Sequence, residues 1–521
     1  MADGRAAAET VEDSGRRQRI LLAVCAALMA VVASVSGLNV AQPQVAVELD
    51  ASQTTVLWII NAYTLTLAAL LLPLGAAGDR WGRKPMLLVG LAAFAAANVL
   101  GALAPSAEVL LAARVVSGIG AAIIMPITLA VITSTFPEAE RAKGIGVWSA
   151  VGGGGGMLGM FLSAVLVDLG SWRWLFVLPV TLAAVAFVIA LLSVPNTRDV
   201  PAHGFDVVGS ITSAVGVVGV ITALHEGPVH GWTTPLSLTA IISAGIALMI
   251  FIPWQLRSRG PLLDLRLFRS PRLSTGSVSL LAAFAVQGGV LIVLLPYFQT
   301  VLGWSGLGAT LGMMPMAMVM MLAAGLAPRV SAPLGIRSTL LIGIALFAGG
   351  LLLLAALVSV DGGYLPVLPG LLVMGVGMGI AMTPATEAIT GALPREHQGL
   401  ASALNDVTRE LGAALGIAVL GASLASGYRS AIEPQLADVP AGTAEAAREG
   451  VANVIAAAGA DADAQGLIRA AQEAFIAGWQ QSMWVGVAVM VVLFAFVTAS
   501  GRRASPRRSA AAPADRPTSA L

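Results

Sequence analysis

The chain has 521 residues, of which 57% are apolar and 11% are charged. Soluble globular proteins have about 45–50% apolar and about 25% charged residues, and a single core stops growing at roughly 250–300 residues. The apolar excess indicates a lipid-covered surface and excludes a cytosolic enzyme, a secreted domain and a nucleic-acid-binding protein. The net charge of +1 attracts no polyanion, and the single cysteine, Cys25, excludes an internal disulfide and a thiolate metal cluster.

Fourteen apolar stretches are long enough to cross a bilayer, which takes about 20 helical residues. The run Leu340 to Val358 shows none of the apolar–polar alternation that is typical of a membrane β-barrel. The sequence therefore predicts an all-α integral membrane protein with transmembrane helices at residues 20–42, 53–77, 85–105, 108–135, 143–168, 172–194, 207–226, 235–256, 273–301, 306–328, 336–359, 364–391, 398–426 and 478–500.

Basic residues lie mainly in both tails and in the loops on one side of these helices. The basic residues of the loops on the other side are Arg173, Arg429, Arg448 and Arg469. The positive-inside rule therefore predicts that both termini are cytoplasmic, which agrees with an even number of helices. The first apolar stretch exceeds the roughly 7–15 residues of a signal peptide, so it is interpreted as a retained helix. The outer loop 427–477 is expected to form a small helical hairpin or cap.

A short charged loop after the second predicted helix contains Gly75, Asp79, Arg80, Gly82 and Arg83. Glycines permit a tight reversal, and an aspartate can cap a helix start and pair with an arginine. The simplest interpretation is a charged turn that obeys the positive-inside rule. The spacing also resembles the loop signature of the major facilitator superfamily. A weaker copy at 326–337 follows the tenth predicted helix.

Two six-helix halves, each with such a loop, leave the seventh and eighth helices as an insertion. This arrangement is similar to that of the fourteen-helix drug:proton antiporters of the superfamily (the EmrB/QacA type). The resemblance implies a major facilitator fold with a cytoplasmic tail 1–19, an N-terminal half 20–194, inserted helices 207–256, a cytoplasmic linker 257–272, a C-terminal half 273–500 that includes the outer loop 427–477, and a cytoplasmic tail 501–521.

Two segments depart from the family pattern. Many relatives carry an acidic residue five positions before the Asn of an Asn-Val-Ala-x-Pro segment, and the matching residue here is Ser34. The fifth-helix exporter signature, which resembles Gly-Pro-x-x-Gly-Gly, reads Gly-Met-Phe-Leu-Ser-Ala at 159–164. The glycine run before it, 152–156, is either a hinge or a site of close packing. Proton-coupled uptake and a non-transporting sensor therefore remain alternatives to export.

Five ionisable residues lie well inside predicted helices: Arg114, Glu387, Asp406, Arg409 and Glu410. A charge at bilayer depth costs at least about 2.5–3.5 kcal/mol, so these residues are candidates for proton coupling. Asp406 and Glu410 share a helix face and Arg409 can reach Asp406, so a structural ion-pair network is the alternative. Glu387 has no basic neighbour on its own helix. Arg114 matches the arginine of the family's fourth-helix signature, where the resemblance implies a part in proton transfer.

The expected substrate cavity has an uncharged wall in the N-terminal half. Its candidate residues are Ser34, Asn39, Gln42, Trp58, Asn61 and Tyr63. Recognition of a dication favours two carboxylates, and those of the C-terminal half are partly offset by Arg409. We therefore expect a lipophilic substrate that is neutral or singly charged, although these six residues could instead face lipid or neighbouring helices.

The sequence has no phosphate-binding Gly-rich loop followed by Lys-Ser/Thr, no nucleophile elbow and no His-Glu-x-x-His motif. We therefore expect no enzyme activity, no metal and no cofactor, with the proton gradient as the energy source. The expected partners are the lipid bilayer, protons and a small lipophilic molecule, and the expected state is a monomer in a bacterial plasma membrane. Asp206 and Glu226, at the ends of the seventh helix, are expected to be solvated.

Overall fold

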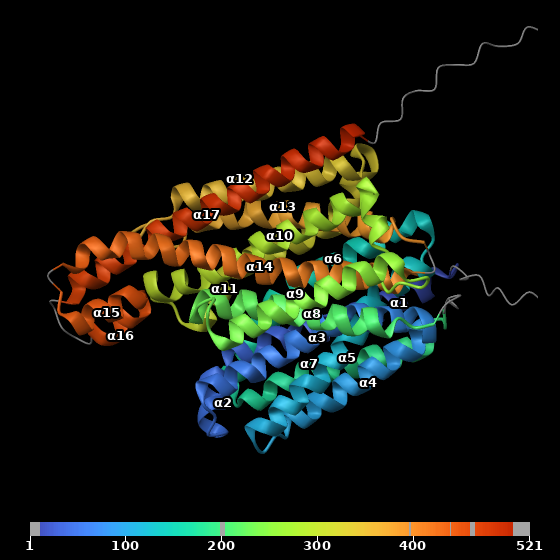
Figure 1. The fold of residues 1–521 in the computed structure, drawn as a ribbon, viewed down its shortest axis with the longest axis horizontal. Coiled ribbons are helices and arrows are strands. Elements are labelled where there is room, and N and C mark those ends of the chain that lie inside the picture. The colour runs from blue at the N-terminus through green and yellow to red at the C-terminus, as the bar shows by residue number, and fades with distance from the viewer. Residues whose placement is uncertain (1–10, 198–203, 395–396, 438, 459–463, 504–521) are drawn as a thin grey trace, which may run out of the picture.

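The computed structural model describes residues 11–197, 204–394, 397–437, 439–458 and 464–503 (Figure 1). Every regular element in these ranges is a helix. Fourteen helices of the described chain are long and apolar enough to cross a membrane, one for each stretch that the sequence predicts. The predicted all-α fold with fourteen membrane-spanning helices is therefore confirmed.

Each half contributes six of these helices. The N-terminal half consists of α1 (Ser14–Val40), α3 (Gln53–Trp81), α4 (Arg83–Ala102), α5 (Ala107–Thr135), α6 (Glu138–Leu169) and α7 (Val177–Ser193), with short α2 (Gln42–Glu48) and η1 (Trp172–Phe176). The C-terminal half consists of α10 (Pro271–Pro296), α11 (Gly306–Leu334), α12 (Ile336–Leu357), α13 (Val367–Thr390), α14 (Gln398–Ile432) and α17 (Ala464–Arg503), with short η2 (Leu265–Arg269), η3 (Tyr297–Val301), η5 (Glu433–Leu436), α15 (Ala441–Glu449) and α16 (Val451–Ala458).

Local sequence explains where several helices begin and end. The hydroxyls of Ser52, Ser106 and Ser305 accept hydrogen bonds from the first-turn amides of α3, α5 and α11, as N-caps do. Gly82 and Gly335 end α3 and α11 with positive φ values of 105° and 80°, a conformation that favours glycine. The equivalent places of these two glycines support the internal repeat that the sequence indicates.

The inserted helices α8 (Val207–His230) and α9 (Pro235–Arg257) lie between the two halves in Figure 1. α8 packs on α3 of the N-terminal half and on α14 of the C-terminal half. Ala68, Ile221 and Ala414 form the apolar contact among these three helices. The insertion therefore covers one junction between the halves.

Asp206, expected to be solvated, holds this insertion together instead. Its carboxylate caps α8 at the Gly209 amide (2.8 Å) and accepts hydrogen bonds from Trp254 Nε1 (2.8 Å), Gln255 Nε2 (2.9 Å) and the Leu262 amide (2.9 Å). Burial raises the pKa of this carboxyl, but the four hydrogen bonds outweigh burial and hold the pKa below its ordinary value. The expectation was wrong because the donors on α9 and on the segment after it come into reach only in the folded chain.

α1 begins and α17 ends at the same end of the bundle, opposite α15 and α16 (Figure 1). We call this the inner end, because the basic residues predict that it faces the cytoplasm, and the opposite end the outer end. α17 begins at Ala464, well before the predicted residue 478, and therefore extends beyond the apolar span. Tyr428 ties α15 to α14 through a hydrogen bond from its hydroxyl to the Ala447 carbonyl (2.6 Å).

Packing between the halves is densest toward the inner end. Residues 120–135 of α5 and 398–409 of α14 are buried on every side, whereas the outer part of each helix buries only some of its faces. A helix buried all round lies inside a packed bundle. The inner end is therefore closed in this structure.

Candidate functional site

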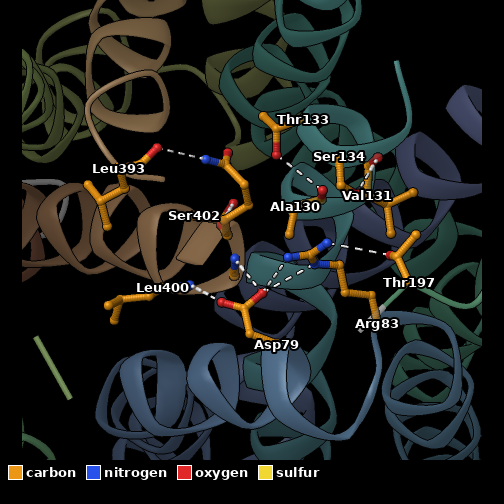
Figure 2. A network of polar contacts seen from close by, with 12 residues as sticks. Asp79, Arg83, Ala130, Val131, Thr133, Ser134, Thr197, Leu393, Leu400 and Ser402 are labelled. Carbon is orange, nitrogen blue, oxygen red and sulfur yellow. Dashed lines mark hydrogen bonds and ion pairs between the residues drawn. The ribbon is translucent and has the colours of Figure 1, made fainter. Parts of the chain in front are cut away.

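Asp79 is the central residue of the closed inner end (Figure 2). Its carboxylate accepts two hydrogen bonds from Arg83, at 3.2 Å from Nε and 2.8 Å from Nη2. It also accepts hydrogen bonds from the backbone amides of Gly399 (2.9 Å) and Leu400 (3.1 Å), in the first turn of α14. An aspartate of the N-terminal half thus caps a helix of the C-terminal half, where the helix dipole favours negative charge.

Small residues allow this contact to form. A Cβ at Gly75 would lie 2.8 Å from the Gly399 carbonyl oxygen, and a Cβ at Gly399 would lie 2.6 Å from the Gly75 carbonyl oxygen. The backbones of α3 and α14 therefore touch directly. Arg83 continues the network to the Thr197 hydroxyl (3.5 Å), while Arg80 lies in the last turn of α3. Gly75 and Asp79 thus contact the C-terminal half directly, and Arg83 is joined to this contact through Asp79.

Asp406 and Arg409 form a buried pair further along α14. Arg409 Nη1 lies 3.7 Å from Asp406 Oδ1, and Asn405 donates to the same oxygen at 3.2 Å. Asp406 Oδ2 and Arg409 Nη1 find no hydrogen-bond partner among the described residues. The pair is therefore in contact but incompletely hydrogen-bonded, which is costly for buried charges.

Arg409 also joins the two halves. Its Nη2 donates to the Gly152 carbonyl of α6 (3.1 Å), and its guanidinium lies over Phe284 (4.6 Å to the ring centroid) and Trp148 (5.5 Å). A Cβ at Gly154 would overlap Cγ of Met321. Glycines 152–155 of the run therefore pack closely against neighbouring side chains, and α6 is a continuous helix through the run.

Glu410 is the first carboxylate of α14 beyond the fully buried segment. It is half-buried and interacts electrostatically with Arg409 and with Tyr63 of α3. Asp406 and Glu410 thus lie on either side of the point where the packed inner end gives way to the more exposed outer part.

Arg114, Ser34 and Tyr63 come together in the N-terminal half. Arg114 Nη1 donates to the Ser34 hydroxyl (3.0 Å), its Nε donates to the Ile59 carbonyl (3.4 Å), and the guanidinium lies 4.2 Å from the centroid of the Tyr63 ring. Arg114 Nη2 has no hydrogen-bond partner among the described residues, although the side chain is 1% exposed. Ser34 thus occupies the place where an acidic residue would pair with Arg114.

The remaining candidates lie apart from these clusters. Glu387 is half-buried in an inner-end cleft of about 880 Å³ that Lys143, Arg272 and Arg329 also line. Trp58 and Asn61 line a separate cavity against α8. Gln42 begins α2. The side chain of Asn39 lies outside the described part of the chain.

Sequence reasoning missed several residues of these sites, among them Gly399 and Asn98. Gly399 supplies a backbone amide that Asp79 caps. The sequence signal for this residue was its position two residues after His397, in the first turn of a helix. Asn98 of α4 is 1% exposed and lies 3.4 Å from the Ser34 hydroxyl. Among the residues that the structure describes, no group of three His, Cys, Asp or Glu side chains could hold a metal ion.

The model of the Major Facilitator Superfamily matches residues 22–417. The chain belongs to this superfamily. The match agrees with the predicted major facilitator fold, in which α8 and α9 are two helices inserted between six-helix halves.

Several relatives are named after drug resistance or efflux. The multidrug efflux pump LfrA of Mycolicibacterium smegmatis is 32% identical over 89% of this chain and 92% of its own length. The multidrug resistance protein Stp of Mycobacterium tuberculosis is 30% identical over 76% and 74%. The tetracenomycin C resistance and export protein of Streptomyces glaucescens is 31% identical over 79% and 77%.

Solved structures support the fold. The human organic anion transporter MFSD10 aligns with 93% of this chain and 100% of its own, with a TM-score of 0.60 at 16% identity. The proton:xylose symporter XylE aligns with 93% and 96%, with a TM-score of 0.57 at 14% identity. At these identities the likeness concerns the fold alone.

Proposed function

We propose that this major facilitator protein exports a lipophilic organic molecule, an antibiotic, drug or secondary metabolite, by alternating access driven by protons. The names of the relatives support export, because they denote efflux pumps and resistance proteins. They also weigh against the two alternatives, uptake of a small solute and a sensor that transports nothing. We take the transport unit to be a monomer in a bacterial plasma membrane with cytoplasmic termini.

The observation that carries the proton-coupling proposal is the incompletely satisfied Asp406–Arg409 pair. Asp406 is fully buried, and its Oδ2 lacks a hydrogen-bond donor within the described chain. A proton bound there neutralises the carboxylate and adds a donor, whereas loss of the proton restores the charge that faces Arg409. Because Arg409 donates to Gly152 of the other half, a change in its pairing acts directly on the junction between the halves.

The other ionisable residues take supporting roles in this proposal. Glu410 receives the proton from the outer side, since it borders the more exposed part of α14. Glu387 releases a proton toward the inner surface through the cleft that it lines. Arg114 and Ser34 belong to the N-terminal wall of the proposed substrate cavity. Arg114 contributes one buried positive charge there and has no acidic partner within hydrogen-bonding distance among the described residues.

Alternating access then requires the inner end to open. The caps from Asp79 to Gly399 and Leu400 join the two halves, so they break when the halves rock apart. The bonds between Asp79 and Arg83 lie within one half and remain. Asp79 thus stabilises the state with the closed inner end.

A resistance panel tests the substrate class. An efflux-deficient bacterial host that expresses the chain is compared with its empty-vector control for survival on monovalent dyes, divalent bisguanidines and neutral antibiotics. We expect protection against monovalent or neutral compounds. Protection against the divalent compounds alone would contradict the assignment, and no protection against any lipophilic compound would favour the uptake or sensor alternatives.

A further inference from the structure

A second cavity, of about 440 Å³, lies near the outer end between α3 and the inserted helices α8 and α9. Drug-sized ligands occupy cavities of about 300–1,000 Å³. Leu65 and Thr222 line it. Leu65 lies about one helical turn from Ala68, and Thr222 follows Ile221. Ala68 and Ile221 are in the contact that joins α3 to α8. The cavity therefore begins just beyond the point where the insertion seals the junction between the halves.

The lining combines one carboxylate with an aromatic ring. Among the lining residues that the structure describes, Glu226 is the one acidic residue, and none is Lys or Arg. The indole of Trp58 lies on the opposite wall and is 41% exposed. A carboxylate and an aromatic ring that line the same cavity are the combination that attracts organic cations. The amide of Asn61 and the hydroxyl of Thr222 add hydrogen-bonding groups without charge.

His230 orients the carboxylate. Its Nδ1 lies 2.8 Å from Glu226 Oε2, one helical turn away on α8. A hydrogen bond from the imidazole Nδ1–H fixes the orientation of the carboxylate. Leu57, Leu65 and Leu236 supply apolar surface around it, which suits a flat aromatic body better than a hydrated inorganic ion.

We propose that this pocket binds an aromatic organic cation with a single positive charge, paired with Glu226 and stacked on Trp58. The proposal deepens the proposed function and rests on it for its role, since such a cation is one of the molecules that we propose the chain exports. The inserted helices then form one wall of a binding site that two six-helix halves alone do not contain. A single carboxylate also predicts that a dication is not preferred there.

Direct binding to the purified full chain in lipid nanodiscs tests the pocket. We expect saturable binding of ethidium, an aromatic monocation. We expect its dissociation constant to be about tenfold higher in Glu226→Gln and in Trp58→Leu. Matched controls are Glu108→Gln and Trp174→Leu, which change exposed residues elsewhere at the outer end. Unchanged affinity in both pocket variants, equal losses in the controls, or no saturable binding by the wild type would overturn the proposal.

Cysteine labelling locates the ligand independently of affinity. Cys25 is the single cysteine, so Thr222→Cys in a Cys25→Ala background reports on this cavity. We expect ethidium to slow labelling by a maleimide at least fivefold, and an uncharged phenanthridine to have little effect. No protection, or equal protection by the neutral compound, would overturn a cation site.

Failure of the proposed function gives a different pattern. If ethidium binds with these dependencies but the wild type exports none of it from loaded vesicles, then the pocket stands and its place in export does not.

Discussion

The cap that Asp79 places on α14 allows a quantitative prediction about gating. Opening the inner end breaks the bonds to the amides of Gly399 and Leu400, at 2.9 and 3.1 Å, but not those to Arg83. A hydrogen bond to a charged group contributes about 1.5–3 kcal/mol, and the favourable charge at a helix start adds about 0.3–1 kcal/mol. Asp79→Asn keeps one acceptor oxygen and loses the charge. We expect it to destabilise the closed inner end by about 2 kcal/mol, which is about a 30-fold shift toward the open state.

Cysteine labelling measures this shift. Ala403 packs on Gly75 at the junction, so Ala403→Cys in a Cys25→Ala background is inaccessible while the inner end is closed. In everted vesicles we expect Asp79→Asn to speed maleimide labelling at this position and to lower turnover more than substrate affinity. Asp50→Asn is the matched control, because Asp50 is exposed and has a positive φ that asparagine tolerates. Equal labelling rates in Asp79→Asn and the wild type would refute the gating role.

Four further predictions test other parts of the account. Ser34→Asp should raise the melting temperature, because it gives Arg114 a counter-charge. Ser34→Ala should lower the melting temperature, because it removes a hydrogen-bond acceptor worth about 1–3 kcal/mol. A higher melting temperature for Ser34→Ala than for Ser34→Asp would contradict the geometry. Arg409→Met alone should lower protein yield, and Asp406→Asn in the same chain should restore it if the pair is structurally coupled. Glu387→Gln should insert normally and lose gradient-driven export, since an amide exchanges no proton; normal pH-dependent export would remove Glu387 from the mechanism. Asp206→Ala should lower the free energy of unfolding by about 2 kcal/mol. Hydrogen bonds hold the pKa of Asp206 below its ordinary value. Its contribution to stability is therefore present above the unfolded pKa of about 3.9 and is lost only as the pH falls through the lower folded pKa. The melting curves of wild type and variant should accordingly converge only in acid.

The sequence predicts the fold well because lipid imposes a simple rule. Each span must be an apolar helix of about 20 residues, so the fourteen stretches and the repeated loop at Gly82 and Gly335 were visible without coordinates. Local chemistry also predicted that Arg409 reaches Asp406 and that Asp79 pairs with an arginine. The start of α17 was placed too late, because a helix continues beyond the apolar stretch when it packs on other protein.

The contacts between distant segments could not be predicted from one sequence. Nothing in the loop around Asp79 indicates that its second partner lies 320 residues away at Gly399. The described residues among the six expected on one cavity wall separate because successive helix positions face different neighbours. Tyr63 turns toward Arg114, whereas Asn61, two residues earlier, faces α8. Which way each face points depends on packing that only the assembled bundle determines.

Proton-driven accumulation in everted vesicles tests the central claim most directly. Vesicles that contain the wild type, energised to an acidic interior, are compared with vesicles that contain Asp406→Asn at equal protein yield. The account predicts that the wild type accumulates a lipophilic dye or antibiotic, that collapse of the proton gradient releases it, and that Asp406→Asn accumulates at least tenfold less. Equal gradient-dependent accumulation by the variant would contradict a proton-carrying role for Asp406, and accumulation that ignores the gradient would contradict proton-coupled export itself.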